Sequence, residues 1–182
     1  WLRVRAPVGE NLNNIKRLLA NKRLNTVCAS ASCPNMGECW NRGTATFMIL
    51  GNECTRACRF CDVKTKKFPS PVDLLEPNRV ALAVKEMALK HVVITSVARD
   101  DLVDGGASQF VNYLKEISRL SSLITTEVLV PDFKGKRELI SLVVEQGPNI
   151  FNHNIETVER LTKKIRSGAI YSRSLKVLST AK

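Results

Sequence analysis

The sequence has no apolar run that approaches the ~20 residues needed to cross a membrane. It also lacks the short amino-terminal apolar segment of a secretory signal peptide. Because disulfides form mainly in exported proteins, we expect reduced thiols, a cytoplasmic location and no membrane partner. The chain begins at Trp1 rather than Met, so we expect a fragment or trimmed chain, and removal of a mitochondrial or plastid transit peptide stays open.

Aromatic residues are scarce, at 5% of the chain, and no motif of the RNP or zinc-finger kind is present. This scarcity predicts that nucleic acid is not a partner. Acidic residues are also few, with 17 Asp and Glu against 28 Lys and Arg and a net charge of +11. Such a charge indicates either a solvated basic surface or a surface that suits an acidic partner.

What remains is the composition of one globular domain, with 182 residues and 44% hydrophobic residues. Strand-like and helix-like patterns alternate, which predicts an α/β fold with parallel strands. The four expected strands are residues 46–51, 92–97, 126–130 and 150–154. Helices are expected from the apolar faces Val80/Val84/Met87, Phe110/Leu114/Ile117, Leu139/Val143 and Val158/Leu161/Ile165, and over residues 172–182.

The first 43 residues differ in character from the rest of the chain. Residues 1–9 show no regular period, and Asn11 is expected to cap a helix with Leu12, Ile15 and Leu19 on one face. Residues 25–41 carry three cysteines among polar and small residues. We expect that segment to be a loop that does not pack a core and is ordered by a bound cluster.

All cysteines fall into two groups of three, spaced C-x4-C-x5-C and C-x3-C-x2-C. They are Cys28, Cys33 and Cys39, and Cys54, Cys58 and Cys61. Three thiolates on a short loop can hold three irons of a [4Fe–4S] cluster and leave the fourth iron open to a small molecule. Zinc fits less well, because its sites usually pair cysteines in two knuckles and close with four ligands. For the first group, buried thiols or disulfides are the alternatives to a second cluster.

The second group follows a strand-like run, and Phe60 stands directly before its last cysteine. This pattern resembles the radical S-adenosylmethionine (SAM) family. The resemblance implies that SAM chelates the open iron. An electron from the cluster then splits SAM into methionine and a 5′-deoxyadenosyl radical.

The two groups together are similar to those of the lipoyl synthases within that family, and the similarity continues through residues 43–51, 94–107, 129–135 and 151–157. The resemblance implies a sulfurtransferase that inserts two sulfur atoms into a protein-bound octanoyl chain to give the lipoyl cofactor. The SAM cluster would sit on Cys54, Cys58 and Cys61. An auxiliary [4Fe–4S] cluster that donates the sulfurs would sit on the first group.

The same resemblance implies a fold, a domain division and partners. The fold is a partial (β/α) barrel of the radical SAM kind, with an amino-terminal arm and auxiliary-cluster loop over 1–43 and the barrel over 44–182. The partners are octanoylated lipoyl carrier domains, which are acyltransferase subunits of 2-oxoacid dehydrogenases and the glycine cleavage H protein. An electron donor such as ferredoxin or flavodoxin is implied as well.

The sequence departs from this family in several places. The family's barrel has six β/α units, and the four expected strands of this sequence account for about four of them. The carboxy-terminal Arg-Ser-Ser-Tyr motif, whose serine is the fourth ligand of the auxiliary cluster, is absent. We therefore expect the gene product to continue beyond Lys182 and the chain alone to be inactive. Ala29-Ser30 stands in place of an acidic pair, and Glu159 and Ser167 stand in place of prolines.

Polar residues near the expected carboxyl ends of the strands are candidates for SAM contacts. The candidates are Phe60, Thr95, Ser96, Asp100, Asn152 and Asn154. Each has a structural alternative: Asp100, Asp101 and Asp104 could cap the next helix, and Asn152 and Asn154 could be hydrogen-bonded at a strand end. We expect His91 and His153 to be structural.

Three other functions stay open. A different radical SAM enzyme could use the auxiliary cluster only to pass electrons or to anchor substrate. A ferredoxin-like carrier with two clusters would not cleave SAM. A zinc-bound nucleic-acid module would contain zinc in place of iron.

Overall fold

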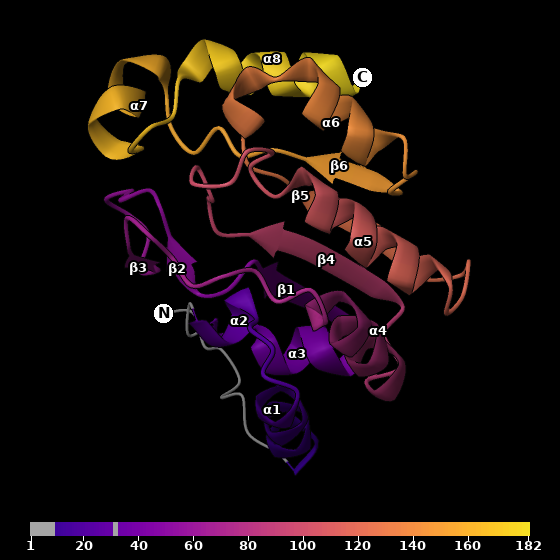
Figure 1. Cartoon of the computed structure of the whole chain (residues 1–182). Coiled ribbons are helices and arrows are strands. Elements are labelled where there is room, and N and C mark those ends of the chain that lie inside the picture. Colours follow the sequence, from indigo (N-terminus) through magenta and orange to yellow (C-terminus); the bar gives the residue numbers. More distant parts are fainter. Residues whose placement is uncertain (1–9, 31–32) are drawn as a thin grey trace.

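A parallel sheet of four strands forms the centre of the molecule (Figure 1). The computed structural model describes residues 10–30 and 33–182. The strands lie in the order β1-β4-β5-β6, and they are β1 (Thr44–Ile49), β4 (His91–Ser96), β5 (Thr125–Leu129) and β6 (Ile150–Asn152). The expected strands and their parallel arrangement are therefore confirmed, with strand ends that differ by up to two residues.

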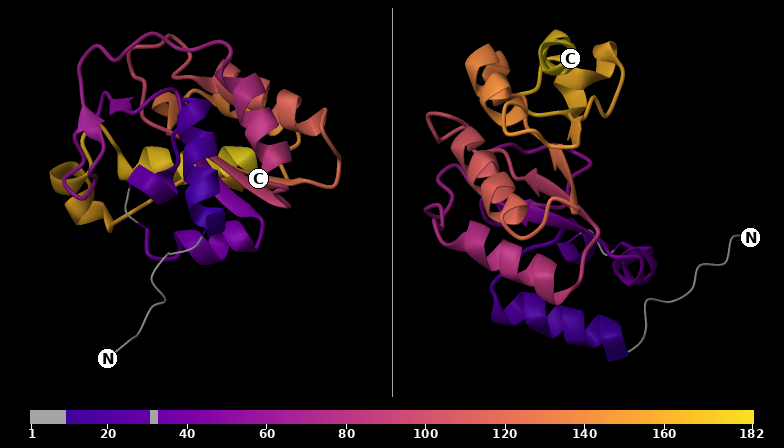
Figure 2. Two further views of the ribbon diagram at one scale, coloured as in Figure 1. Left: turned by 90° about the horizontal axis from the view of Figure 1, so that it is seen from below. Right: turned by 90° about the vertical axis from the view of Figure 1, so that its right-hand side faces the viewer.

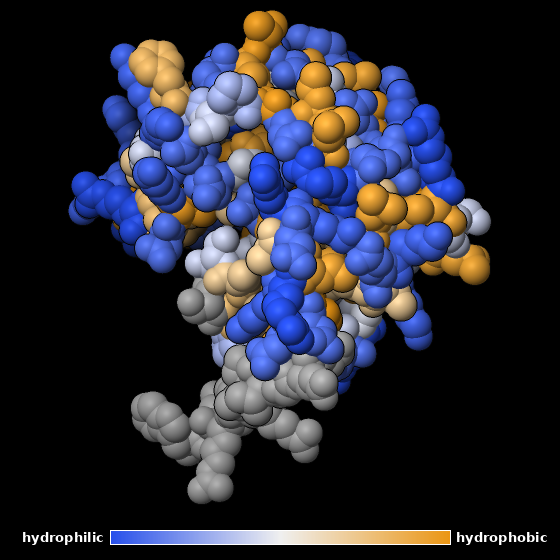
Figure 3. Space-filling view, turned by 60° about the horizontal axis from the view of Figure 1, so that its bottom comes forward, coloured by the Kyte–Doolittle hydropathy of each residue, from blue (hydrophilic) through white to orange (hydrophobic). Residues whose placement is uncertain are grey.

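Helices alternate with these strands, as the periodicity predicts. The helices α4 (Glu76–Glu86), α5 (Ala107–Ser118) and α6 (Arg137–Val144) cover one face of the sheet (Figure 2). After β6 come α7 (Glu159–Ile165) and α8 (Tyr171–Ala181), and α8 packs against α6 and the short η1 helix (Phe133–Gly135). Hydrophilic side chains dominate the face in Figure 3, and apolar side chains form separate areas. No helix in the described ranges has the length and apolar content of a membrane span.

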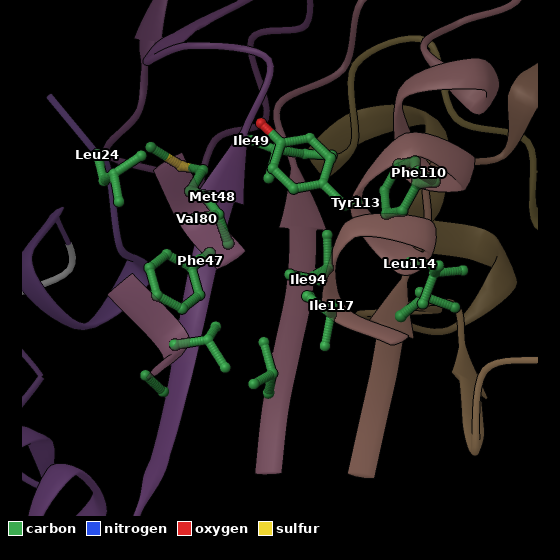
Figure 4. Close-up of a cluster of buried hydrophobic side chains, with 14 of the residues drawn as sticks. Leu24, Phe47, Met48, Ile49, Val80, Ile94, Phe110, Tyr113, Leu114 and Ile117 are labelled. Carbon is green, nitrogen blue, oxygen red and sulfur yellow. The ribbon is translucent and has the colours of Figure 1, made fainter. Parts of the chain in front are cut away.

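The main core lies between the sheet and its helix layer (Figure 4). Phe47, Ile94 and Val128 are paired across neighbouring strands and are fully buried. Because alternate residues of a strand point to opposite faces, all three point to the same side. Phe110 and Ile117 of α5 are fully buried in the same core, and the apolar helix faces expected from the sequence thus find their partners.

The segment from residue 25 to 41 corrects the sequence-based expectation. It is not a loop without a core, because it forms α2 (Val27–Ser30) and α3 (Met36–Asn41), which pack against β1. Met36 and Trp40 are buried, and their spacing of four residues places them on one face of α3. Thr26 also forms an antiparallel bridge with Phe47. Two apolar side chains, Met36 and Trp40, thus join this cysteine-bearing segment to the core.

The helix before this segment is α1 (Glu10–Asn21). Leu12, Ile15 and Leu19 are buried as the sequence predicts, and they belong to the same core cluster as the sheet. Asn11 is the second residue of α1 rather than the residue before the helix, so it does not stand at the expected capping position. The expected irregular arm, residues 1–9, lies outside the described residues.

Candidate functional site

The loops that follow the four strands meet at one edge of the sheet, on the left in Figure 1. The carboxyl ends of parallel strands gather there, which is where active sites of such folds lie. After β1 the chain turns through Leu50 and Gly51, both with positive φ (68° and 92°), into β2 (Glu53–Cys54). This turn delivers the second group of cysteines to the edge.

Cys54, Cys58 and Cys61 are free thiols, with Cys61 exposed and the other two half-buried. Burial raises the pKa of the Cys58 thiol, and the nearby Cys54 and Cys61 raise it further, whereas the Ser167 backbone N–H and Arg166 act to lower it. The three thiols are therefore close enough to interact. The structure brings together the three residues that the spacing predicted as a ligand set.

Backbone hydrogen bonds fix this cysteine loop from three sides. Thr55 N donates to Ala98 O after β4 (2.9 Å), and Arg59 N donates to Ile165 O at the end of α7 (2.9 Å). Lys66 N, which follows β3 (Lys64–Thr65), donates to Cys54 O (2.9 Å). The loop is thus held by parts of the chain that are far apart in sequence.

Arg56, inside the C-x3-C spacing, is a residue of this edge that sequence reasoning missed. Its guanidinium donates to Asp100 from Nε (2.7 Å) and Nη2 (2.8 Å), and to Asp132 from Nη2 (2.8 Å) and Nη1 (3.1 Å). Asp100 follows β4 and Asp132 follows β5. One side chain therefore ties the cysteine loop to the ends of two strands. A basic residue between two cysteines was the only available signal.

Asp132 is the buried centre of this network, with a side chain that is 1% exposed. It also accepts from Arg173 Nη1 of α8 (3.1 Å) and from Lys134 N (3.1 Å). Burial acts to raise the pKa of Asp132, but the bonds from Arg56 hold it below its usual range. The pKa of Asp100 is lowered too, first by Arg56. Both carboxylates are thus kept ionised.

The first group of cysteines is brought together as well. Cys28 is buried on α2, Cys39 lies on α3, and Cys33 N donates to Cys28 O (3.0 Å). Burial raises the pKa of Cys39, and nearby Cys28 and Cys33 raise it further. Residues 31–32, between these cysteines, lie outside the described residues. Within the described ranges no three His, Cys, Asp or Glu side chains converge on a point where a single metal ion could be held.

Comparison with known proteins decides the family. The family model of the radical SAM superfamily matches residues 48–182. The match includes the second cysteine group and the carboxyl ends of all four strands, and it begins inside β1. The chain belongs to the radical SAM superfamily.

Curated relatives of this radical SAM chain are named lipoyl synthase. That of Caldanaerobacter subterraneus is 55% identical over 182 residues, and that of Karelsulcia muelleri is 51% identical over 182 residues. A relative from Nematostella vectensis, named "Lipoyl synthase, mitochondrial", is 51% identical over 178 residues. The matches cover 100%, 100% and 98% of this chain but only 63%, 63% and 61% of those relatives.

The residues predicted to contact SAM are scattered along the edge. The Thr95 hydroxyl donates to Leu129 O on the neighbouring strand (3.0 Å), and the Asn152 amide donates to Glu127 Oε1 (2.6 Å). Ser96 Oγ is buried and has no hydrogen-bond partner among the described residues. Phe60, which directly precedes Cys61, has 53% of its surface exposed to solvent.

The structure places two other candidates, Asn154 and Asp100, differently from what the sequence predicts. Asn154 is exposed and lies beyond β6, which ends at Asn152, so strand alternation does not place the two on one face. Asp100 holds Arg56 and accepts from the Thr55 hydroxyl (3.1 Å) rather than capping α5. Among the three aspartates, Asp104 alone binds the first turn of α5, through Gly106 N and Ser108 N (2.9 Å each).

Both histidines have hydrogen-bond partners within the fold. His91 Nε2 lies 2.9 Å from Glu127 Oε2. His153 is buried, with Nδ1 bonded to Val130 O (2.8 Å) and Nε2 to Ser174 Oγ of α8 (3.0 Å). Because a carbonyl only accepts, the proton of neutral His153 lies on Nδ1. These contacts agree with the expected structural role.

Proposed function

We propose that this chain carries the radical SAM site of a lipoyl synthase, which inserts two sulfur atoms into a protein-bound octanoyl chain. The observation that carries the proposal is the pair of gathered cysteine groups, together with 51–55% identity to proteins of that name. The chain spans 63% of the length of those relatives. The activity, substrates and partners of the whole protein are therefore proposals.

The donor set of the second group fits a [4Fe–4S] cluster. Three free thiols lie on one short loop at the sheet edge, and no fourth cysteine is near them in the sequence. We assign Cys54, Cys58 and Cys61 as its ligands. When bound there, the cluster would supply the electron that cleaves SAM, which provides the radical needed to attack an unactivated C–H bond.

The polar edge of the sheet is the proposed SAM site. Thr95 and Asn152 are in register through Leu129 and so share one face of the sheet, where they offer hydrogen-bonding groups to the methionine or ribose part of SAM. Ser96, whose hydroxyl has no partner among the described residues, ends β4, and Asn154 follows β6; both are further candidates at this edge. Phe60 is free to lie against the adenine. Asp100 contributes through Arg56, because both of its oxygens already accept from that side chain.

We assign Cys28, Cys33 and Cys39 to the auxiliary [4Fe–4S] cluster, the source of the inserted sulfurs. The three thiols interact, and two of them lie on helices that pack against β1. In this proposal residues 1–43 form the auxiliary-cluster region and residues 44–182 the barrel region. The shared core of α1 and β1 supports a fixed relation between them.

An acidic protein domain is the proposed macromolecular substrate, namely an octanoylated lipoyl carrier domain of an acyltransferase subunit or the glycine cleavage H protein. Exposed basic side chains surround the cysteine loop and α7: Arg59, Lys64, Lys66, Lys67, Arg160, Lys163 and Lys164. The two segments are joined by the bond from Arg59 N to Ile165 O. Complementary charge speeds such encounters. A ferredoxin or flavodoxin is the proposed electron donor, in a reducing compartment such as the cytoplasm.

Iron and labile sulfide per chain, after anaerobic reconstitution, test this proposal. Two four-iron clusters predict about eight irons, and a variant with Cys28, Cys33 and Cys39 changed to Ala should hold about four. Loss of auxiliary sulfide during turnover separates sulfur donation from electron transfer. About four irons in both proteins would contradict the auxiliary assignment. Absence of SAM cleavage would favour an electron carrier, and zinc in place of iron would overturn the radical reading.

A further inference from the structure

The parallel sheet has a second face, opposite the layer of α4, α5 and α6 (Figure 2). Val93 and Leu129 point to this face and are half-buried, whereas their neighbours Ile94 and Val128 are fully buried in the core. Glu127 pairs with Val93 across the strands and therefore points to the same face. Because a carboxylate away from bulk water is costly unless it is hydrogen-bonded, the partners of Glu127 indicate its role.

Each oxygen of Glu127 has one hydrogen-bond partner. The Nδ2 atom of Asn152 lies 2.6 Å from Oε1, and His91 Nε2 lies 2.9 Å from Oε2. His91 begins β4, Glu127 is the middle residue of β5, and Asn152 ends β6. The three side chains thus form a diagonal row across this face, and the row ends at the edge where we propose that SAM binds.

The chemistry of a carboxylate fixes the orientation of the Asn152 side chain. An ionised carboxylate only accepts hydrogen bonds, so the atom of Asn152 beside it is the NH₂ group, and His91 carries a proton on Nε2. Rotation of the amide by 180° would set Oδ1 against Oε1 and oppose two acceptors. Within the part of the chain that the structure describes, Oδ1 forms no hydrogen bond. It is therefore the atom of Asn152 that is left to bind a ligand.

We infer that Glu127 is a positioning residue of the SAM site and acts through Asn152. It holds the amide in the one orientation that leaves Oδ1, an acceptor, for the ligand. The matching part of SAM is then a hydrogen-bond donor, namely its ammonium group or a ribose hydroxyl. His91 binds the other oxygen and so keeps the carboxylate from turning. The inference rests on the SAM site of the proposed function.

Thr95 presents an acceptor at the same edge. It is in register with Asn152 through Leu129, and its hydroxyl donates to Leu129 O (3.0 Å). A hydroxyl has one proton, so the Thr95 oxygen can only accept from a ligand. Two strand spacings of ~4.8 Å place these two residues about 10 Å apart, which is too far for one donor group to bridge. The edge therefore suits a ligand with donors at two separate points, as in SAM.

Two isosteric substitutions and their combination separate orientation from packing. Asn152→Asp keeps the shape but sets a second carboxylate against Glu127. Glu127→Gln provides an amide that can pair with either orientation of Asn152, so the competent orientation should be about half populated. In the combined variant the new amide donates to the new carboxylate. The other oxygen of that carboxylate is again an acceptor for the ligand.

The measurement is the SAM affinity of the anaerobically reconstituted chain at pH 8. Binding should weaken roughly tenfold in Asn152→Asp, because like charges repel there, and about twofold in Glu127→Gln. Independent effects would multiply to about twentyfold, but the combined variant should come within about twofold of the parent. Glu138→Gln, on the exposed surface of α6, is the control and should bind like the parent.

Multiplied losses in the combined variant, or an unchanged affinity in Asn152→Asp, would overturn the inference. If the chain still cleaved SAM in that case, the proposed function would stand. A parent chain that binds no SAM would overturn both. Competition with methionine and with 5′-deoxyadenosine identifies the donor. A loss in Asn152→Asp for methionine alone assigns the ammonium, and a loss for 5′-deoxyadenosine alone assigns a ribose hydroxyl; a loss for neither would contradict the inference.

A second measurement does not depend on the folding of Asn152→Asp. In the oxidised reconstituted chain labelled with ¹⁵N-asparagine, one Nδ2 proton of Asn152 should resonate downfield of its twin, because it is bonded to a carboxylate. Glu127→Gln should move that signal upfield, and Glu138→Gln should leave it in place. An Asn152 signal that does not respond to Glu127→Gln would show that Glu127 does not hold the amide.

Discussion

The Arg56 Nη2 atom lies 2.8 Å from Asp132 Oδ1 and joins the loop of the second cysteine group to the end of β5. Asp132 is almost fully buried, so its charge depends on this partner and on Arg173. Removal of one partner from a buried ion pair leaves the other charge without compensation in a medium that solvates it poorly. The pair is consequently the point at which loop position and fold stability are linked.

Arg56→Lys should weaken both properties. Lysine keeps the charge but cannot present a planar fork to two carboxylates. We expect the free energy of unfolding to fall by about 2–4 kcal/mol at neutral pH, measured by urea denaturation of the metal-free chain. Iron retained by the second cysteine group should fall as well. Arg42→Lys is the matched control, because Arg42 pairs with Glu38 on an exposed surface. Equal stability of the two variants would contradict the anchoring role of Arg56.

Tyr113→Phe should destabilise the chain in a pH-dependent manner. The Tyr113 hydroxyl donates to the buried carboxyl of Glu76 (2.5 Å). Burial raises the pKa of Glu76, while the bonds from Tyr113 and from the Leu50 backbone act to lower it. A carboxyl with a raised folded pKa is favoured when protonated, so its contribution to stability is lost as pH rises above its usual pKa.

Loss of the hydroxyl raises the pKa of Glu76 further, so the variant suffers most where Glu76 is ionised. We expect a cost of roughly 1–3 kcal/mol at pH 7 and a smaller cost at pH 4, from denaturation curves at both values. Tyr171→Phe, at the partly exposed start of α8, is the control. A cost that is the same at both pH values would show that Glu76 does not titrate as described.

His153 should make the fold sensitive to acid. Burial lowers the pKa of His153 below its usual value of about 6.5. A group with a depressed folded pKa contributes stability above its unfolded pKa, and that stability is lost as pH falls through the folded pKa. Unfolding free energy should therefore decrease on acidification below pH ~6.5, by about 1.4 kcal/mol per unit of pKa displacement. His153→Gln should flatten this part of the pH profile; an unchanged slope would be evidence against it.

Trp40→Ala tests whether the first cysteine segment belongs to the core without a cluster. Trp40 is 3% exposed on α3, which packs against β1. In the metal-free chain we expect a loss of roughly 3–5 kcal/mol in unfolding free energy, as for other large buried side chains. Leu74→Ala, at a position that is 76% exposed, should cost little. Similar small effects in both variants would mean that a bound cluster is required to order α3.

Reversal of charge beside the cysteine loop tests the proposed docking of an acidic carrier domain. Lys163 and Lys164 lie in the last turn of α7 and are exposed. The double change to Glu should weaken binding of an octanoylated carrier domain roughly tenfold at low salt, with a smaller effect at high salt. Lys85→Glu with Lys115→Glu, in the last turns of α4 and α5, is the matched control. Equal losses in both double variants would indicate a general charge effect.

Much of this protein could be predicted from local features of the sequence. The spacing of the six cysteines predicted two ligand groups, and periodicity identified four strands and the helices that cover them. These signals are short-range, because a turn of helix or a pair of alternating strand residues repeats within a few positions. The same locality led to errors, of which the largest concerns residues 25–41: Met36 and Trp40 carry helical spacing, but polar and small neighbours obscured it.

The contacts that organise the site were decided by the tertiary structure. Arg56 meets Asp100 and Asp132, and Arg59 N meets Ile165 O, only because parallel strands bring their carboxyl ends to one edge and α7 returns to it. A single guanidinium binds two carboxylates that are 32 residues apart in the sequence. The sequence alone determined which residues could bind a cluster. The packing of distant segments determined what surrounds those residues and how firmly they are held.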